Sequence, residues 1–429
     1  MTPKDTAGPE MEPGALGAGR LPRLLAGLDK GGRPMPLTTH RRRYAAPRPG
    51  RPNRELLAVV DRSGLRGRGG AGFPTARKLA AVSERRRPIV VVNGCEGEPA
   101  SGKDKVLLQL APHLVLDGAL LAAAAVGSDE VIVCVDRYAA AAMHSLHQAL
   151  GERQGERGAA VRIEAIPHRY VAGDESALVH WLNGGPAKPT LTPPRPSVSG
   201  VARRPTLVDN VETLAHLAQI AHFGADWFRQ LGTPSIPGST LSGAVLRPGV
   251  CEVAVGTPLD EVVAVGGTGP AGIGAVLVGG YYGSWLSPAQ VGETRLCDDD
   301  LRPIGGGVGC GAVVVLPINA CGLHETARIL SWLAGETAGQ CGPCVNGLAA
   351  IAGAMVELHD GHDTVARLRH WAGQIEGRGA CRFPDGAVRL LRSALTVFTD
   401  DIERHLHGAG CPSRPGTVAV PDVVREPWR

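Results

Sequence analysis

The feature that most restricts the fold of this chain is a regular alternation of strand-like and helix-like segments in its first half. The strand-like segments cover residues 88–93, 130–136 and 161–166, and the helix-like segments cover residues 105–126 and 139–151. Neighbouring parallel strands need a crossover between them, which a helix usually supplies. The alternation therefore predicts an α/β fold with a doubly wound parallel sheet.

The rest of the chain predicts further domains, because 429 residues are many for one hydrophobic core. Short strands between glycines follow at 239–286, and helical periodicity returns at 323–334, 345–358, 364–374 and 385–406. We expect a disordered basic N-terminal arm at 1–53, the α/β domain at 54–236, a small β-rich domain with its connection at 237–318, a four-helix bundle at 319–411 and a tail at 412–429.

Charge and targeting signals exclude several classes of protein. Residues 1–54 hold 11 Lys and Arg against 4 Asp and Glu, so the remainder of this +4 chain is slightly acidic and offers nucleic acid no footprint. The N-terminus lacks the apolar core of a secretory signal. We expect a cytoplasmic protein, at most peripheral to a membrane. Its ten cysteines should be ligands or buried thiols rather than disulfides.

A glycine-rich stretch, Gly64–Thr75, precedes a helical pattern. Glycines let the backbone approach a phosphate closely, and a helix N-terminus attracts the anion. Arg66, Arg68 and Lys78 would add positive charge. A purely structural turn explains these glycines equally well, so both interpretations stay open.

Two acidic segments follow. Asn93-Gly-Cys-Glu-Gly-Glu-Pro99 comes at the carboxyl end of the first strand, the edge where open α/β sheets bind ligands. Its amide and carboxylates can hydrogen-bond a flavin ring or nucleotide hydroxyls; a turn with solvated acids is the alternative. Tyr170–Leu178 and Asp209-Asn210 place polar groups at helix starts, where capping explains them without a ligand.

The cysteines of the helical part form a ligand pattern. Cys341 and Cys344 lie three residues apart before a helix, and Cys381 can meet them from elsewhere in the bundle. Such a group is typical of an iron–sulfur cluster. Structural zinc would need a fourth ligand, for which Cys321, His324 and Cys411 are candidates. A redox disulfide between Cys341 and Cys344 is a third option.

Taken in order, these segments resemble the flavoprotein subunit of respiratory complex I, a family also found in NAD-reducing hydrogenases and formate dehydrogenases. The resemblance covers about Ser63 to Leu406. It implies FMN in the α/β domain, a ubiquitin-like β-grasp domain of the SLBB type at 237–318, and a [4Fe-4S] cluster in the helical bundle.

The resemblance also implies residue roles. Cofactor contacts would fall on Gly64, Arg66, Gly67, Gly69, Gly70, Phe73, Lys78, Asn93, Glu96, Tyr170, Gly173, Asp174 and Asn210. Cys341, Cys344 and Cys381 would bind the cluster, while Glu98 and Glu175 would orient the dinucleotide, which Phe73 also contacts.

The implied activity is oxidation of NADH at FMN, with electrons passing singly through the cluster to a partner. NAD(H) would be the substrate, and the partner a ferredoxin-like or thioredoxin-like iron–sulfur subunit of a hetero-oligomer, itself peripheral to a membrane complex. Two alternatives stay open: a flavoprotein that takes electrons from ferredoxin or a deazaflavin, and a non-catalytic scaffold built on the SLBB domain.

Four positions depart from the family pattern. Ala338 stands where the family has its first cluster cysteine, and Cys95 replaces an aspartate of the acidic loop. Ala81 replaces an aromatic residue that clamps the nicotinamide, and Thr192 a lysine near the dinucleotide. The flavin site is therefore expected to be better kept than the NADH site. With three matched cysteines, four alternatives stay open for the cluster: a three-iron centre, a non-cysteine ligand, recruitment of Cys321 or Cys411, or weak binding.

Overall fold

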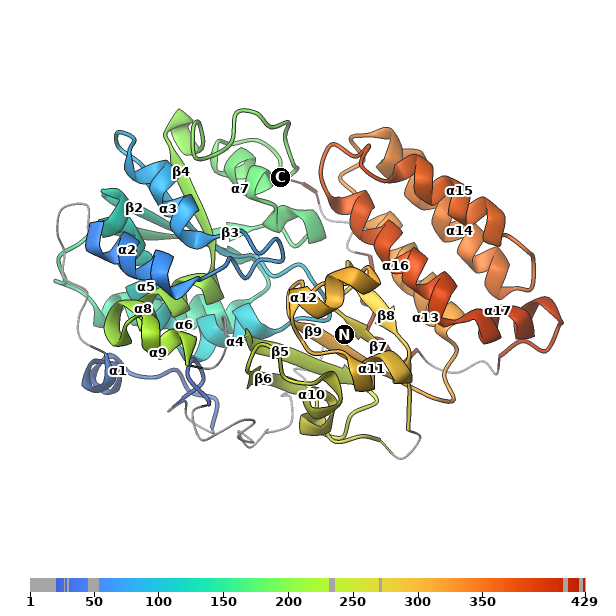
Figure 1. Ribbon diagram of the computed structural model, residues 1–429. Helices are drawn as coiled ribbons and strands as arrows, with labels where there is room; N and C mark the ends of the chain where they lie inside the picture. Colours follow the sequence, from blue (N-terminus) through green and yellow to red (C-terminus); the bar gives the residue numbers. More distant parts are fainter. Residues whose placement is uncertain are drawn as a thin grey trace.

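The structure is a computed structural model that describes residues 21–26, 28, 31–44, 54–230, 236–269, 272–411, 416–423 and 427–428. Figure 1 shows an α/β region and a helical region at opposite ends of an elongated molecule, with a second sheet between them.

The α/β region contains a four-stranded sheet of parallel strands, as predicted. Its strands are β1 (Ile89–Gly94), β2 (Glu130–Asp136), β3 (Ala160–Ile166) and β4 (Thr206–Asn210), in the order β3-β2-β1-β4. The sequence predicted the first three strands but assigned the fourth to the start of a helix. β4 has only five residues and runs directly into α8 (Val211–Phe223), so its alternation is too short to detect.

Helices cover both faces of this sheet. Val90 and Val92 of β1 face a core formed with α2 (Arg54–Ser63), α3 (Thr75–Ser83), α5 (Pro112–Val126), α6 (Ala140–Glu152) and α8. Ile89 and Val91 face the opposite core, which α7 (Glu175–Leu182) covers. This alternation is the two-residue period of a strand buried on both sides.

The long helix predicted at 105–126 is two helices. α4 (Lys103–Leu110) and α5 meet at Ala111 with a bend of 97°. Pro112 begins α5, because proline lacks the N–H that would continue the helix before it. Within the described residues, no single helix has both the length and the apolarity to span a bilayer. Taken together, α4 and α5 are long and apolar enough, by length and composition alone.

The second sheet has five strands. They are β5 (Ile236–Gly243), β6 (Gly249–Val253), β7 (Ile273–Val278), β8 (Ser284–Leu286) and β9 (Ala312–Pro317), in the order β6-β5-β9-β7-β8. β5 and β9 are parallel, and the other neighbours are antiparallel. Along the chain, helix α10 (Leu259–Gly266) comes between β6 and β7, and helices α11 (Pro288–Glu293) and α12 (Asp298–Leu301) come between β8 and β9. Its assignment to the SLBB type stays a prediction.

The helical region contains α13 (Gly322–Gly335), α14 (Leu348–His359), α15 (Val365–Ile375), α16 (Phe383–Val397) and α17 (Thr399–Leu406). The single helix predicted at 385–406 is broken at Phe398, whose ring packs on Trp285 at a centroid distance of 5.2 Å. The break turns α17 back across the ends of α13 and α14.

The described part of the predicted N-terminal arm is packed. Glu252 accepts hydrogen bonds from the backbone N–H groups of Arg23 at 2.6 Å and Leu24 at 2.9 Å. Helix α1 (Leu37–Arg43) places His40 2.7 Å from the carboxylate of Asp117 on α5. The expectation of disorder therefore does not hold for residues 21–44 where they are described; the rest of 1–53 lies outside the described residues.

The end of the chain also differs from the expected loose tail. We call residues 416–423 and 427–428 the C-terminal strap. Val418 is buried against the helical core, the hydroxyl of Tyr281 donates to Ala419 O at 2.6 Å, and Trp428 O accepts from the N–H of Ala187 at 2.9 Å. The strap thus contacts all three regions.

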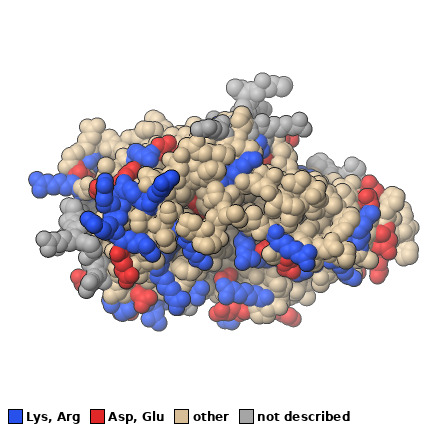
Figure 2. Space-filling model, turned by 90° about the horizontal axis from the view of Figure 1, so that it is seen from above, with Lys and Arg blue, Asp and Glu red and all other residues tan. Residues whose placement is uncertain are grey.

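Lysine and arginine side chains gather on one part of the surface. Figure 2 shows them at the end of the molecule that carries α3 and β4. The turn after α3 contributes exposed Arg85, Arg86 and Arg87.

Candidate functional site

The carboxyl edge of the parallel sheet contains a switch in strand order. The chain proceeds from β1 to β2 and β3 on one side, and β4 lies on the other side of β1. Ligands of open α/β sheets bind at such a point. We call the edge between the carboxyl ends of β1 and β4 the crevice. Asn93 of β1 and Asn210 of β4 are paired in register at this edge, so two predicted site residues meet there.

The glycine-rich loop closes over the same edge. Gly67 N–H donates to Phe73 O at 2.8 Å and Thr75 N–H donates to Leu65 O at 2.9 Å, so the loop folds back on itself. Gly69 lies beside Asn210, where an added Cβ would be 3.7 Å from that residue's Cβ. Gly70 has φ +102°, and an added Cβ there would meet no described atom within 4 Å.

Helix α3 begins at the end of this loop without a side-chain N-cap. The hydroxyl oxygen of Thr75, its first residue, is buried and has no hydrogen-bond partner among the described residues; the same holds for Oδ2 of Asp209 on β4. An uncapped helix start, an open glycine loop and orphaned buried oxygens fit a nucleotide that carries a phosphate and hydroxyls.

Lys78 extends from α3 into this crevice. Its Nζ lies 3.5 Å from Glu175 and 3.7 Å from Asp209, and it donates to Val208 O. Burial raises the pKa of Asp209 to about 6, although the charge of Lys78 opposes the shift. The ammonium group of Lys78 thus lies between two carboxylates beside the glycine-rich loop.

The two arginines of the loop make contacts with α8 and with the loop itself rather than with Glu175 and Asp209, the partners of Lys78. Arg68 N–H donates to Thr213 Oγ1 at 2.9 Å, and its guanidinium Nε lies 3.7 Å from Glu212. Arg66 is exposed and donates to Gly72 O at 3.2 Å. Arg68 therefore ties the loop to α8.

A buried charge network supports Asn210 from behind. Lys103 Nζ lies 2.7 Å from Asp104 and 3.0 Å from Glu212, and Asn210 Nδ2 donates to Asp104 at 2.6 Å. Burial raises the pKa of Asp104 to about 7, against the effect of Lys103. Asn210 Oδ1 also caps α8 by accepting from Glu212 N–H at 3.0 Å. The sequence did not reveal this network, because it joins two segments about 100 residues apart.

The acidic loop is held by its own polar groups. Asn93 Nδ2 donates to Gly173 O at 2.7 Å, and its Oδ1 accepts from Cys95 N–H at 3.1 Å. Glu96 is buried and accepts from the N–H groups of Asp104 at 3.3 Å and Lys105 at 3.2 Å, so it caps α4. The predicted ligand contact of Glu96 would have to coexist with this capping role.

Two glycines let the acidic loop pack against the segment before α7. A Cβ on Gly97 would lie 2.6 Å from Tyr170 O, and a Cβ on Gly173 would lie 2.5 Å from Cys95 O. Both distances are shorter than real contacts, so any larger residue must separate the two backbones.

The two predicted dinucleotide-orienting acids differ in environment. Glu98 accepts hydrogen bonds from Tyr170 Oη at 2.8 Å, Tyr281 N–H at 2.9 Å and Ala100 N–H at 3.1 Å. Burial raises its pKa to about 7 despite these donors. Glu175 is 39% exposed at the start of α7. Glu98 therefore joins the acidic loop to the second sheet, whereas Glu175 is accessible to solvent.

Two further predicted residues have plain structural settings. Asp174 caps α7, accepting from Ser176 N–H at 2.9 Å and Ala177 N–H at 3.3 Å. Phe73 is 45% exposed at the rim of the glycine loop. Asp174 needs no ligand for this role, whereas an exposed aromatic ring at the crevice suits contact with one.

An aromatic cluster joins the crevice to the cysteines. The Tyr170 ring lies 4.8 Å from that of Tyr282 and 5.6 Å from that of Phe383. Burial raises the pKa of Tyr282, and negative charge at Cys381 and Glu98 would raise it further, so its phenol lies between the two sites. The sequence suggested Tyr170 only as a cofactor contact.

The structure brings the three predicted cluster cysteines together. Burial raises the pKa of Cys344 to about 12, and the nearby Cys341 and Cys381 contribute to the rise. Ala338, where the resemblance implies a cluster cysteine, is 6% exposed and offers only a methyl group. Three thiols fit a cluster that takes three protein ligands, and they do not fit one that needs four cysteines.

Cys321 and Cys411 do not complete this set, contrary to one of our options. Cys321 is the N-cap of α13, whereas Ala338 and Cys341 follow the C-terminus of that 14-residue helix. Such a helix is about 20 Å long. Cys411 lies with Cys321, so both are at the far end of the helical region. His324, in the first turn of α13, is at that end too.

Comparison with protein families gives two matches in the expected order. Residues 60–219 match the Nuo51 FMN-binding domain, and residues 324–405 match the NADH-ubiquinone oxidoreductase-F iron-sulfur binding region. The second sheet lies between the two matched ranges.

Whole-chain relatives agree with these matches. The NADH-quinone oxidoreductase F subunit 2 of Rhizobium meliloti is 31% identical over 83% of this chain and 90% of its own length. The NADH-quinone oxidoreductase F subunit of Mycobacterium bovis is 30% identical over 85% of this chain and 87% of its own.

A solved NAD+-reducing [NiFe]-hydrogenase, in the H2-reduced state, superposes with a TM-score of 0.75 at 31% identity. The match covers 82% of this chain and 62% of the hydrogenase chain, so a large part of that chain has no counterpart here. Taken together with the parallel sheet, the crevice and the cysteine loop, these similarities show that the chain belongs to the family of the NADH-quinone oxidoreductase F subunit, the 51 kDa flavoprotein of complex I.

Proposed function

We propose that this chain is an electron-transfer subunit that oxidises NADH at FMN and passes the electrons through an iron–sulfur cluster to a partner protein. The observation that carries the proposal is that aromatic rings lie between the sheet edge at Asn93 and Asn210 and the three neighbouring cysteines Cys341, Cys344 and Cys381. Family membership supports the same interpretation.

FMN would lie in the crevice between β1 and β4. The open loop at Gly67–Gly72 and the N-terminus of α3 suit its phosphate, and Lys78 adds a positive charge beside it. Asn93 and Asn210 fix the edge of the sheet against which the ring would rest. Bound FMN supplies the exchange between two-electron and one-electron transfer.

The protein groups around the crevice position the donor rather than exchange protons with it. Phe73 and Glu175 are accessible at the open side, where a dinucleotide would approach. Glu98 holds the acidic loop in place through Tyr170 and Tyr281. Ala81 and Thr192 leave this side with fewer contacts than the family pattern provides, so we expect weak binding of NADH.

Cys341, Cys344 and Cys381 would hold the cluster. With Ala338 at the fourth position, the protein supplies three thiolates, which suits a three-iron cluster or a [4Fe-4S] cluster with one non-cysteine ligand. Tyr170, Tyr282 and Phe383 pack between this set and the crevice and exclude water there.

The partner would be another subunit of a hetero-oligomer. The named relatives are subunits of quinone oxidoreductases, and the hydrogenase reduces NAD+. We propose an iron–sulfur protein of the ferredoxin or thioredoxin type as the partner, close to the cysteine end of the helical region.

Anaerobic titration tests the activity. The purified protein is mixed with NADH, and in parallel with NADPH, while flavin absorbance is followed. We expect NADH to bleach the flavin and NADPH to do so much more slowly. A flavin that stays oxidised with NADH but is reduced by dithionite would refute NADH oxidation and leave FMN binding intact.

A further inference from the structure

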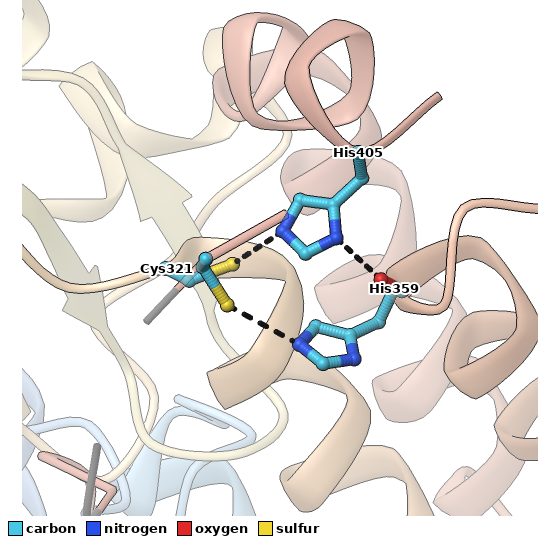
Figure 3. A group of neighbouring side chains, drawn as sticks. Cys321, His359 and His405 are labelled. Carbon is cyan, nitrogen blue, oxygen red and sulfur yellow. Dashed lines mark hydrogen bonds between the residues drawn. The ribbon is translucent and has the colours of Figure 1, made fainter. Parts of the chain in front are cut away.

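Four side chains that are not needed by the proposed activity meet at the far end of the helical region. They are Cys321, His359, His405 and Cys411, and one ligand atom from each lies within 4.8 Å of the other three. Among the described residues this is the set whose geometry suits a single metal ion. Figure 3 shows the imidazoles of His359 and His405 turned toward the sulfur atoms.

Two sulfur–nitrogen distances match edges of a tetrahedron, and all four ligand atoms lie within 4.8 Å of one another. Cys321 Sγ lies 3.4 Å from His405 Nε2, and Cys411 Sγ lies 3.4 Å from His359 Nε2. Ligands at ordinary Zn–S and Zn–N bond lengths are separated by about 3.5 Å in a tetrahedral site. An ion could therefore enter with little movement of the side chains. In a two-iron cluster, two cysteines would bind one iron and two histidines the other. The sulfur atoms would then lie further from the nitrogen atoms than they do here.

Hydrogen bonds at Nδ1 orient both imidazoles so that Nε2 can bind a metal. His405 Nδ1–H donates a hydrogen bond to the backbone carbonyl of His359, and His359 Nδ1 lies 3.2 Å from the Asp360 carboxylate. Because each Nδ1–H donates outward, each Nε2 is left with its lone pair toward the sulfur atoms. Histidines that bind metals in proteins usually have such partners.

Charge and burial favour a divalent cation. Two thiolates and two neutral imidazoles carry −2, which Zn²⁺ neutralises. Cys321 is 8% exposed and His405 4% exposed, so an unneutralised pair of thiolates would be costly there. With four protein ligands the set has no open position, which is the arrangement of structural rather than catalytic zinc.

The four ligands come from separate pieces of chain. Cys321 caps α13, His359 ends α14, His405 lies on α17, and Cys411 follows α17 just before the C-terminal strap. Asp401 of α17 already accepts from Gly322 N–H at 2.7 Å at the same place. A metal here would fix the break at Phe398 and anchor the start of the strap.

We propose that Cys321, His359, His405 and Cys411 form a structural zinc site, separate from the iron–sulfur ligands at the other end of the bundle. It does not depend on the proposed oxidation of NADH, because it uses none of the residues of the crevice or of the cysteine loop.

Metal analysis of the full-length protein tests this site. The protein is purified without added metal, and zinc and iron are measured together by plasma mass spectrometry. We expect about one zinc per chain. After removal of zinc by a chelator, added Co²⁺ should give the intense visible bands and the thiolate charge-transfer absorption of a tetrahedral S₂N₂ site.

Paired variants separate the two metal sites. Cys321→Ser and His405→Gln should lower zinc from about one to less than about 0.1 per chain and leave flavin and iron unchanged. Cys341→Ser should lower iron and leave zinc unchanged. Cys297→Ser, a cysteine outside both sets, should change neither.

Three results would overturn the proposal. The first is wild-type protein that holds no zinc and gives no thiolate band with Co²⁺; this result does not rely on any variant folding. The second is iron, rather than zinc, lost on Cys321→Ser. The third is a Cys321–Cys411 disulfide found by peptide mass spectrometry in protein purified under reducing conditions. None of them bears on NADH reduction of the flavin.

Discussion

The crevice at the sheet edge and the cysteine loop at Ala338–Cys344 are sites of different construction. At the crevice, main-chain contacts and short polar side chains determine the shape: Asn93 with Gly173, Gly97 with Tyr170, Asn210 with Asp104. At the loop, the number of thiolates would determine which cluster can bind, and Ala338 stands where the resemblance implies a cysteine.

This difference explains how the two sites tolerate change. Cys95 stands where the resemblance implies an aspartate, yet its carbonyl accepts from Gly97 N–H at 3.2 Å and its N–H donates to Asn93 Oδ1. A backbone contact survives a change of side chain. Ala338 removes a ligand outright, because a methyl group cannot bind iron. The crevice should therefore be sensitive to changes in the space between backbones, and the loop to the count of sulfur atoms.

The largest effect should follow Gly97→Ala. The new Cβ would lie 2.6 Å from Tyr170 O, so the acidic loop must move away from the segment before α7. We expect a loss of at least about 2 kcal/mol in the free energy of unfolding, together with loss of bound FMN. Thermal unfolding and flavin content measure both. Gly353→Ala is the control, since an added Cβ at this exposed helical position meets nothing within 4 Å. Equal behaviour of the two variants would break the comparison.

Lys78→Gln should have the next largest effect. It removes the cation that lies between Glu175 and Asp209 beside the glycine loop. The Kd for FMN should rise about tenfold to hundredfold, equivalent to about 1.4–2.7 kcal/mol. Fluorescence titration of deflavinated protein gives this value. Arg77→Gln removes a neighbouring exposed charge from the same helix and should leave the Kd within about twofold. A similar change in both variants would mean that only general charge matters.

Ala338→Cys sharpens the other side of the comparison. A fourth thiol at this position should raise iron from about three to about four atoms per chain, or replace the non-cysteine ligand of a four-iron cluster. Iron analysis and paramagnetic resonance before and after reduction distinguish these cases. Unchanged iron content and an unchanged spectrum would show that position 338 does not face the cluster.

The smallest effect concerns Glu98 and is confined to a pH range. Its pKa is raised from an ordinary 4.5 to about 7, so the folded protein binds this proton more tightly than the unfolded chain does. The stability contribution is complete below pH 4.5 and is lost as the pH rises through 7. Glu98→Gln should remove this fall of stability with rising pH. Melting temperatures of both proteins between pH 5 and 8 test it; parallel curves would contradict the shift.

Much of the fold could be predicted from local pattern. Strands β1, β2 and β3 are long enough for their apolar residues to identify them. β4 was missed because five residues give too little alternation. The long helices were overextended at Pro112 and Phe398, where one proline and one tertiary contact with Trp285 end the regular pattern.

The site was predictable where it depends on segments close in sequence. The glycine loop, the acidic loop and Cys341 with Cys344 are each contained in a short motif. The Lys103–Asp104–Asn210–Glu212 network and the Cys321–His359–His405–Cys411 set combine residues from distant elements. No spacing rule joins them, so only the packing of α4 with α8, and of α13 with α14 and α17, brings them together.

The C-terminal strap has a consequence for the order of assembly during translation. Its residues leave the ribosome after the elements that they contact, among them the segment that follows α7, the β7–β8 connection and α13. The links that it makes from Ala419 to Tyr281 and from Trp428 to Ala187 can therefore form only after all three regions have been synthesised. Until then the three regions are not joined by these contacts.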